Sequence, residues 1–259
     1  MKGLNYTLIT GSSGFLGKTI SKTLLNSNKN LFISDLNEKK LTNLKYSLSK
    51  KFKKKIISFP CDLEDINSRN NLIKYIKEKK ININCLINNA AFVGTSNLSG
   101  WNETFEKQSI DTWVRCMEVN LNSVFHISQA LAPILKKNKN ANIVNIGSIY
   151  GFLAPDKNLY KDTDINNPAA YSVSKSGIIY LTKWLASYLA PKIRVNCISP
   201  GGIFRNQDKL FVKKYIQSTP LKRMATEEDF IGVIKFLTSD ASNYITGQNI
   251  IVDGGKSII

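Results

Sequence analysis

Short apolar runs alternate with longer mixed segments along the chain, and this alternation predicts the fold. In the longer segments, apolar residues recur every three or four positions, which is typical of helices packed on one side. The short runs predict strands at residues 4–10, 30–34, 55–60, 84–87, 141–146, 193–198 and 249–252. The segments between them predict helices at residues 18–25 and near 38–50, 65–79, 110–135, 167–183, 208–217 and 227–239. Strands that alternate with helices form a parallel sheet covered on both faces, so we expect an α/β, doubly wound parallel sheet.

The alternation continues without a linker, an internal repeat or a low-complexity tail. A chain of 259 residues can bury one large core, so we expect a single domain over residues 1–259. No apolar run is long enough to span a bilayer, and the first residues lead directly into the first predicted strand. These features predict a soluble, cytoplasmic protein.

The first predicted strand ends in a glycine-rich turn that opens the first helix. The turn runs from Gly11 through Gly14 to Gly17. Glycines let the backbone turn tightly and approach a ligand closely, and the free amides of a helix N-terminus attract phosphate. Strand, glycine turn and helix in this order bind the diphosphate of a dinucleotide in a Rossmann fold, which is the fold we expect.

An acidic residue, Asp35, ends the second predicted strand. It follows the glycine turn by roughly twenty residues, the distance at which an acidic side chain can accept hydrogen bonds from the adenosine ribose. A carboxylate there would repel the 2′-phosphate of NADP, so the sequence favours NAD over NADP. Lys39 and Lys40 lie close enough to oppose this preference.

Polar motifs follow the other predicted strands where each strand ends. Because parallel strands present their carboxyl ends at one edge of the sheet, we expect these motifs to meet in one cleft. They are Asp62-Leu63, Asn88-Asn89-Ala90, Gly147-Ser148, Pro200-Gly201-Gly202 and Asp253-Gly254-Gly255.

The helix predicted at residues 167–183 carries Tyr171 and Lys175 four positions apart. That spacing places both side chains on one face, one turn apart. A neighbouring ammonium favours the phenolate and should lower the tyrosine pKa toward neutrality. Such a tyrosine can exchange a proton with an alcohol or carbonyl oxygen. The same spacing also fits an ordinary amphipathic helix with a surface tyrosine and lysine.

The cysteines and the single histidine do not indicate a metal site. The cysteines lie in separate apolar runs without a C-x-x-C pair, which predicts buried thiols in a reducing compartment. His126 lies in an apolar helical segment with no partner at ligand spacing, so a packed helix position is expected for it. The cysteines are Cys61, Cys85, Cys116 and Cys197.

The formal net charge of +17 raises the question of nucleic-acid binding. The basic residues are 31 Lys against 5 Arg and are spread along the chain. Nucleic-acid readers usually concentrate arginine and aromatic residues on one element. We therefore expect no nucleic-acid partner, although a positive field can attract a phosphorylated substrate or cofactor.

Taken in chain order, these motifs resemble the short-chain dehydrogenase/reductase family over nearly the whole sequence. None of the motifs is specific by itself, but the ordered set is. The matching residues are Thr10-Gly11, Gly14, Gly17, Asp35, Asp62, Asn88-Asn89-Ala90, Asn120, Ser148, Tyr171, Lys175 and Pro200-Gly201.

The resemblance implies a catalytic tetrad of Asn120, Ser148, Tyr171 and Lys175. Tyr171 would be the general acid/base, and Ser148 would polarise the reacting oxygen. Lys175 would bind the nicotinamide ribose and lower the Tyr171 pKa, and Asn120 would seat a water in the proton relay. It also implies cofactor contacts at Gly11, Ser13, Gly14, Phe15, Leu16, Asp35, Asp62, Leu63, Asn89, Ala90, Tyr171, Lys175, Pro200, Gly201 and Ile203.

Three features depart from the family pattern. The middle glycine, Gly14, stands one place earlier than is usual in the short single-domain branch. The stretch between Ser148 and Tyr171 is longer than in most relatives, and we interpret it as an enlarged substrate wall. Arg205 stands where the family often has a threonine near the cofactor. This arginine is either a two-point contact for a substrate phosphate or carboxylate, beside Ser148 and Tyr171, or a surface residue on a mobile lid.

Several stretches are similar to bacterial oxidoreductases of surface-sugar and flagellin-modification pathways. This similarity implies a secondary alcohol or ketone on a sugar, a sugar phosphate or a nucleotide-linked sugar, and fits the polar loop from Thr95 to Ser109. The alternatives are a 3-oxoacyl carrier-protein reductase, whose acidic carrier would suit the positive charge, and a non-catalytic NAD-binding regulator. The family resemblance further implies a homotetramer or homodimer built through the Asn120 and Tyr171 helices.

Overall fold

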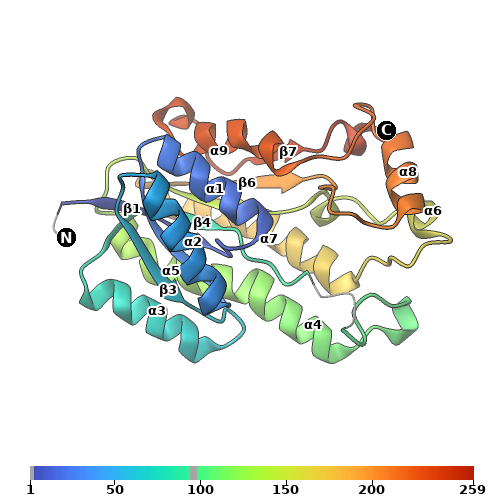
Figure 1. Cartoon of the computed structure of the whole chain (residues 1–259), viewed down its shortest axis with the longest axis horizontal. Helices are drawn as coiled ribbons and strands as arrows, with labels where there is room; N and C mark the ends of the chain where they lie inside the picture. Colours follow the sequence, from blue (N-terminus) through green and yellow to red (C-terminus); the bar gives the residue numbers. More distant parts are fainter. Residues whose placement is uncertain (1–2, 94–97) are drawn as a thin grey trace.

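A seven-stranded, all-parallel sheet forms the centre of the molecule in the computed structural model, which describes residues 3–93 and 98–259 (Figure 1). The strand order is β3-β2-β1-β4-β5-β6-β7, and every neighbouring pair is parallel. This confirms the doubly wound α/β prediction. The strands are β1 (Asn5–Thr10), β2 (Asn30–Asp35), β3 (Ile56–Pro60), β4 (Asn82–Asn88), β5 (Ala141–Ile146), β6 (Ile193–Pro200) and β7 (Asn249–Val252).

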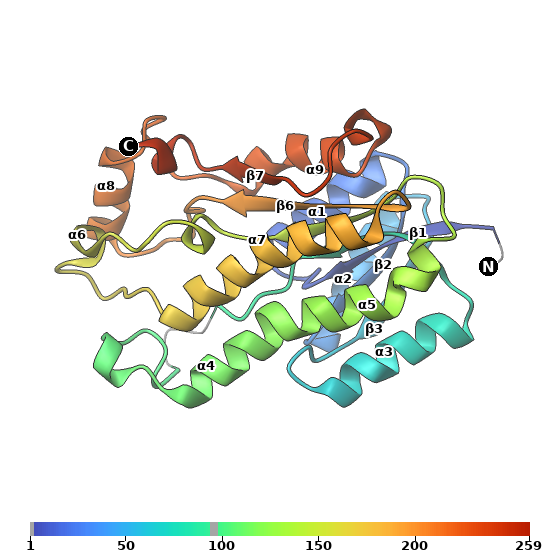
Figure 2. The same cartoon turned by 180° about the vertical axis from the view of Figure 1, so that it is seen from behind.

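Helices cover both faces of the sheet, and each face has its own apolar core. On one face, α1, α2 and α9 pack against the strands through leucine and isoleucine side chains. On the other face, α3, α5 and α7 do the same (Figure 2). The helices are α1 (Phe15–Asn26), α2 (Glu38–Lys51), α3 (Ile66–Glu78), α4 (Ile110–Met117), α5 (Ser123–Leu135), α6 (Lys157–Tyr160), α7 (Ala169–Leu189), α8 (Lys209–Gln217) and α9 (Ile231–Leu237).

The glycine turn brings α1 against the end of β1. A Cβ atom on Gly17 would lie 2.1 Å from the Gly11 carbonyl oxygen, so only glycine allows this approach. Gly11 itself has a φ of +62°, a conformation that glycine adopts without strain. At Gly14 the space is also restricted, because a Cβ atom there would lie 3.3 Å from the Gly11 carbonyl oxygen.

Two segments differ from the sequence prediction. The single helix expected at residues 110–135 is divided by a π-helical turn, Glu118–Asn122, between α4 and α5. The apolar spacing on either side hid this wider turn. The short helix α6 was not predicted, because four residues are too few to show a periodic pattern. Residues 95–97 of the expected polar loop lie outside the described residues.

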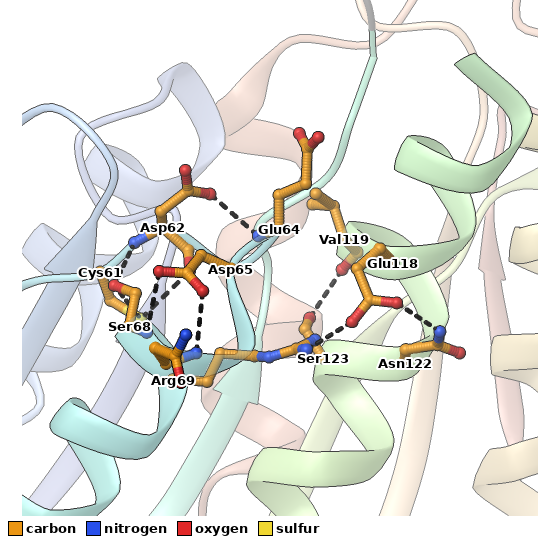
Figure 3. Close-up of polar contacts among 11 residues, drawn as sticks. Cys61, Asp62, Glu64, Asp65, Ser68, Arg69, Glu118, Val119, Asn122 and Ser123 are labelled. Atoms are coloured by element: carbon orange, nitrogen blue, oxygen red, sulfur yellow. Dashed lines mark hydrogen bonds and ion pairs between the residues drawn. The ribbon is translucent and has the colours of Figure 1, made fainter. Parts of the chain in front are cut away.

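The π-turn is held by a group of polar side chains between α3 and α5 (Figure 3). Arg69 of α3, whose side chain is 2% exposed, forms an ion pair with Glu118 at the start of the turn. Asn122 at its end donates to the other Glu118 carboxylate oxygen at 2.6 Å. Nε and Nη1 of Arg69 have no hydrogen-bond partner within the described residues. Glu118 is therefore the principal partner of a buried cation.

We expect Glu118→Ala to lower the free energy of unfolding by about 3 kcal/mol, because it leaves the buried Arg69 charge uncompensated. Urea denaturation would measure the change. The matched control is Glu64→Ala, which breaks the half-exposed pair with Arg115 and should cost less than about 1 kcal/mol. Adding Arg69→Met to Glu118→Ala should recover most of the loss. Equal losses for the two glutamate variants would contradict this account.

Candidate active site

A cavity of about 800 Å³ lies at the carboxyl edge of the sheet. Its volume is in the range of small-molecule sites. Its walls come from the residues that follow β1 to β6 and from the first turns of α7. It brings together every residue predicted to contact a cofactor, which are Gly11, Ser13, Gly14, Phe15, Leu16, Asp35, Asp62, Leu63, Asn89, Ala90, Tyr171, Lys175, Pro200, Gly201 and Ile203.

One part of the cavity is formed by the N-terminus of α1. Gly14 is the N-cap and offers no side-chain acceptor, and the first turn contains no acidic residue. The first-turn amides of a helix have no intrahelical acceptors and carry a partial positive charge. This donor set fits the diphosphate of a dinucleotide.

A second part of the cavity lies around Asp35 at the end of β2. Its Oδ2 accepts a hydrogen bond from the Ser13 amide at 2.8 Å, and its Oδ1 accepts one from the Asn37 amide at 3.4 Å. The carboxylate is therefore fixed in orientation before any ligand binds. Lys40 also lines the cavity, whereas Lys39 is not among the lining residues.

The third part contains the predicted catalytic side chains Ser148, Tyr171 and Lys175. Helix α7 carries Tyr171 and Lys175 on one face, and Ser148 follows β5. Lys175 Nζ donates to the Ile146 carbonyl oxygen at 2.8 Å and lies 5.6 Å from the centre of the Tyr171 ring. The Ser148 hydroxyl lies beside the Tyr171 hydroxyl. A substrate oxygen between these two hydroxyls could exchange a proton with one and a hydrogen bond with the other.

The predicted direction of the Tyr171 pKa shift is wrong for the chain without ligands. Burial raises the pKa of Tyr171, and the Ser148 hydroxyl and the Arg205 guanidinium offset part of the rise. Lys175 does not lower it, because burial lowers the pKa of Lys175 itself to about 8 and its Nζ is bonded to a backbone carbonyl. Desolvation, which spacing along a helix cannot reveal, outweighs the expected charge effect.

Asn120 lies behind the cavity and does not line it. Its Oδ1 accepts from the Phe92 amide at 2.6 Å, and its Nδ2 donates to Ser174 Oγ at 3.0 Å. The side chain therefore ties the segment after β4 to helix α7. Its role in seating a relay water stays a prediction.

Two tyrosines that no sequence motif indicated lie near Ser148. Tyr150 lines the cavity two positions after Ser148, and its hydroxyl accepts a hydrogen bond from the Tyr160 hydroxyl. Asn167 donates to the Tyr160 hydroxyl at 3.3 Å. Tyr150 could have been found from the sequence only by its closeness to Ser148. Tyr160 could not, because it comes near Ser148 only through the folding of α6 toward the site.

Arg205 lies at the cavity wall in an ion pair. Its Nε and Nη2 donate to the same Glu227 carboxylate oxygen at 3.1 and 3.0 Å. Its guanidinium carbon stands 4.8 Å from the centre of the Phe15 ring. The residue is thus held in place beside the glycine turn.

Across residues 3–93 and 98–259, no three His, Cys, Asp or Glu side chains gather in a way that could hold a metal ion. In the same part of the chain, every helix is too short or too polar to cross a membrane.

Comparisons with known proteins agree with this geometry. The family model described as enoyl-(acyl carrier protein) reductase matches residues 12–257. The chain is 33% identical over 249 residues to the post-translational flagellin modification protein A of Campylobacter coli, covering 95% of this chain and 96% of the relative. It is 35% identical over 253 residues to the 3-oxoacyl carrier-protein reductase FabG of Buchnera aphidicola subsp. Schizaphis graminum, covering 96% and 95%.

Among solved structures, the chain is similar to a short-chain dehydrogenase from Leptospira borgpetersenii with bound NAD⁺. The TM-score is 0.84 and the identity 35%, over 98% of this chain and 93% of that one. The family match spans nearly the whole chain and the same fold binds a nicotinamide dinucleotide in this relative. The chain therefore belongs to the short-chain dehydrogenase/reductase family, as a single-domain oxidoreductase that acts on CH–OH groups with a nicotinamide cofactor.

Proposed function

We propose that this enzyme interconverts a secondary alcohol and a ketone on a sugar or sugar phosphate with NAD(H), in bacterial surface-polysaccharide or flagellin-glycan biosynthesis. The main support for this reaction is that Ser148, Tyr171 and Lys175 line the same cavity as the residues predicted to contact the dinucleotide. The sugar assignment is supported by the near full-length similarity to a flagellin modification protein.

When bound, the nicotinamide supplies or accepts the hydride. The chain's own residues handle the substrate oxygen and its proton. The Tyr171 hydroxyl gives the proton to a ketone oxygen or takes it from an alcohol, and Ser148 holds that oxygen by a hydrogen bond. Lys175, with a pKa of about 8, exchanges protons readily near neutral pH and can restore the proton of Tyr171.

The part of the cavity beside Ser148 and Tyr171 suits a polar substrate. The Tyr150 hydroxyl, bonded to Tyr160, can also donate to or accept from a substrate hydroxyl. A polyhydroxylated ring has hydroxyl groups at several positions. A 3-oxoacyl chain has no hydroxyl next to its reacting ketone, where the thioester carbonyl is the only other polar group. The aromatic rings would cover the apolar face of a sugar.

A 3-oxoacyl carrier-protein reductase remains the second candidate, because a FabG relative is 35% identical over nearly the whole chain and the net charge is +17. A substrate screen separates the two. We expect NAD reduction with nucleotide sugars or sugar phosphates, and little oxidation of NADH with 3-oxoacyl thioesters. The reverse pattern would favour the carrier-protein reductase. Cofactor binding without turnover of either class would favour a non-catalytic regulator.

Tyr171→Phe should lower kcat by roughly 10²- to 10⁴-fold, because it removes the group that exchanges the proton. NADH binding should change little, since the ring stays in place. Turnover is followed by NADH absorbance and binding by NADH fluorescence. Tyr244→Phe, at a fully exposed position, is the matched control. If Tyr171→Phe kept most of its turnover, the assigned mechanism would be wrong.

We propose that Asp35 gives the enzyme its preference for NAD over NADP. The charge-neutral variant Asp35→Asn keeps an oxygen that can accept from the Ser13 amide, so the turn should be preserved. Removing the charge should narrow the NADH-to-NADPH affinity ratio by about tenfold, since one charge–charge repulsion is lost. Fluorescence titration with both cofactors measures the ratio. An unchanged ratio, or tighter NADPH binding by the wild type, would show that Lys40 overrides Asp35.

We also propose self-association through the face formed by α4, α5 and α7. These helices run side by side on one side of the molecule (Figure 2). The face exposes large apolar side chains, and on α7 they recur every fourth residue. They are Val114, Phe125, Tyr180, Trp184 and Tyr188.

On this basis the purified enzyme should have the mass of a dimer or tetramer, and Trp184→Glu should shift it toward the monomer. A buried charge at a central interface position is poorly tolerated. Light scattering after gel filtration measures the mass, with Tyr244→Glu as the control on another surface. A monomeric wild type, or a Trp184→Glu variant of unchanged mass, would contradict the proposed interface.

A further inference from the structure

We propose that Arg205 binds the diphosphate of the dinucleotide, and that its ion pair with Glu227 positions it for this contact. The assignment differs from a substrate role for the same residue. It rests on the use of a nicotinamide dinucleotide but not on the identity of the substrate.

The first argument is the position of the guanidinium. It lies over the ring of Phe15, with 4.8 Å between its carbon and the ring centre. Phe15 is the first residue of α1, directly after the N-cap Gly14. Phe15 is therefore one of the first-turn residues whose amides would face a diphosphate, and Arg205 lies over its ring.

The second argument is the distribution of positive charge around the cavity. Four cationic side chains line it, namely Lys40, Arg115, Lys175 and Arg205. Lys175 is buried beside Tyr171, and Lys40 belongs to α2 beyond Asp35. Arg115 of α4 is paired with Glu64, which precedes α3. Only Arg205 stands at the N-terminus of α1, where a diphosphate carries its two charges.

The third argument is orientation. Glu227 accepts from Nε and Nη2 of Arg205 through one oxygen, so Nη1 has no partner among the described residues. The Arg205 amide donates to Gln207 Oε1 at 2.7 Å, and Gln207 Nε2 donates to the Ile203 carbonyl oxygen at 2.7 Å. Backbone and side chain are therefore both ordered before binding, which reduces the entropy lost when a ligand arrives.

Glu227 also stabilises the positive charge of Arg205 at the cavity wall. The Arg205 side chain is 35% exposed and that of Glu227 is 19% exposed. The glutamate compensates the arginine while the cavity contains only solvent. When a diphosphate binds, the guanidinium can donate to both acceptors, because its donors point in different directions.

The test compares the binding of NADH and ADP-ribose, which share the diphosphate but not the nicotinamide. Arg205→Thr should weaken both by the same factor, roughly 10- to 100-fold, the effect expected for a charge-assisted hydrogen bond. Arg205→Lys should fall between the wild type and Arg205→Thr, because it keeps the charge but loses the planar fork. NADH fluorescence gives one dissociation constant, and displacement of NADH gives the other.

Arg223→Thr is the matched control. It removes the same charge and a bidentate pair with Asp229, at 2.7 Å, but lies outside the cavity lining. Its NADH affinity should stay within about twofold of the wild type, which excludes a general effect of net charge. Thermal unfolding checks that each variant is folded.

Two results would overturn the proposal. If ADP-ribose bound equally well to wild type and Arg205→Thr while NADH weakened, the arginine would act on the nicotinamide end. If the affinities for NADH and ADP-ribose were both unchanged and only the KM for the carbonyl or alcohol substrate rose, Arg205 would be a substrate-binding residue. Failure of the wild type to bind either ligand would instead contradict the use of a dinucleotide.

Discussion

The reversal of strand order at β1 and β4 is the constraint on which the site depends. From β1 the chain adds β2 and β3 on one side, and it then adds β4 to β7 on the other. The helices that follow β1 and β4 therefore leave the sheet on opposite faces, and neither can fill the space between them. The cavity occupies this position, so the glycine turn and the first turns of α7 line the same space although 160 residues of chain separate Gly11 from Tyr171.

Buried polar contacts between the sheet and α7 keep the catalytic side chains in register with that edge. Asn88 at the end of β4 donates to Asn145 of β5 at 2.8 Å, and Asn145 donates to Thr182 of α7 at 2.9 Å. One residue further along β5, the Ile146 carbonyl accepts from Lys175. Because a buried polar group without a partner is costly, such a chain allows few alternative placements of the helix. The position of Tyr171 thus depends on the core as well as on its own helix.

The sequence predicted the order of strands and helices well, because both faces of the sheet are buried and the apolar runs are correspondingly clear. It also predicted most of the residues that meet in the cavity, since strand ends of a parallel sheet must converge. The prediction failed for Asp253-Gly254-Gly255 after β7, which does not line the cavity, and Asn120 lies behind it. The sequence did not predict the π-turn at Glu118–Asn122, because one extra residue in a single turn hardly changes the spacing of apolar residues along the helix. The expected pKa of Tyr171 failed for a different reason. Helical spacing shows that Lys175 is near, but only the folded chain shows that both groups are desolvated.

Arg205 illustrates a further limit of reasoning from motif position alone. Its place after Pro200-Gly201 made it a candidate for substrate binding, whereas its contacts with Phe15 and Glu227 join it to the N-terminus of α1. The carboxylates Asp35, Asp62 and Glu64 line the cavity toward β2 and β3, and Arg205 and Lys175 line it toward β6 and α7. Because Lys40 and Arg115 also line the carboxylate side, that side carries both signs of charge, whereas Arg205 and Lys175 have no lining carboxylate on theirs. We therefore expect a dinucleotide to bind with its adenosine ribose toward Asp35 and its nicotinamide toward Tyr171, which is the orientation that the order of the motifs predicts.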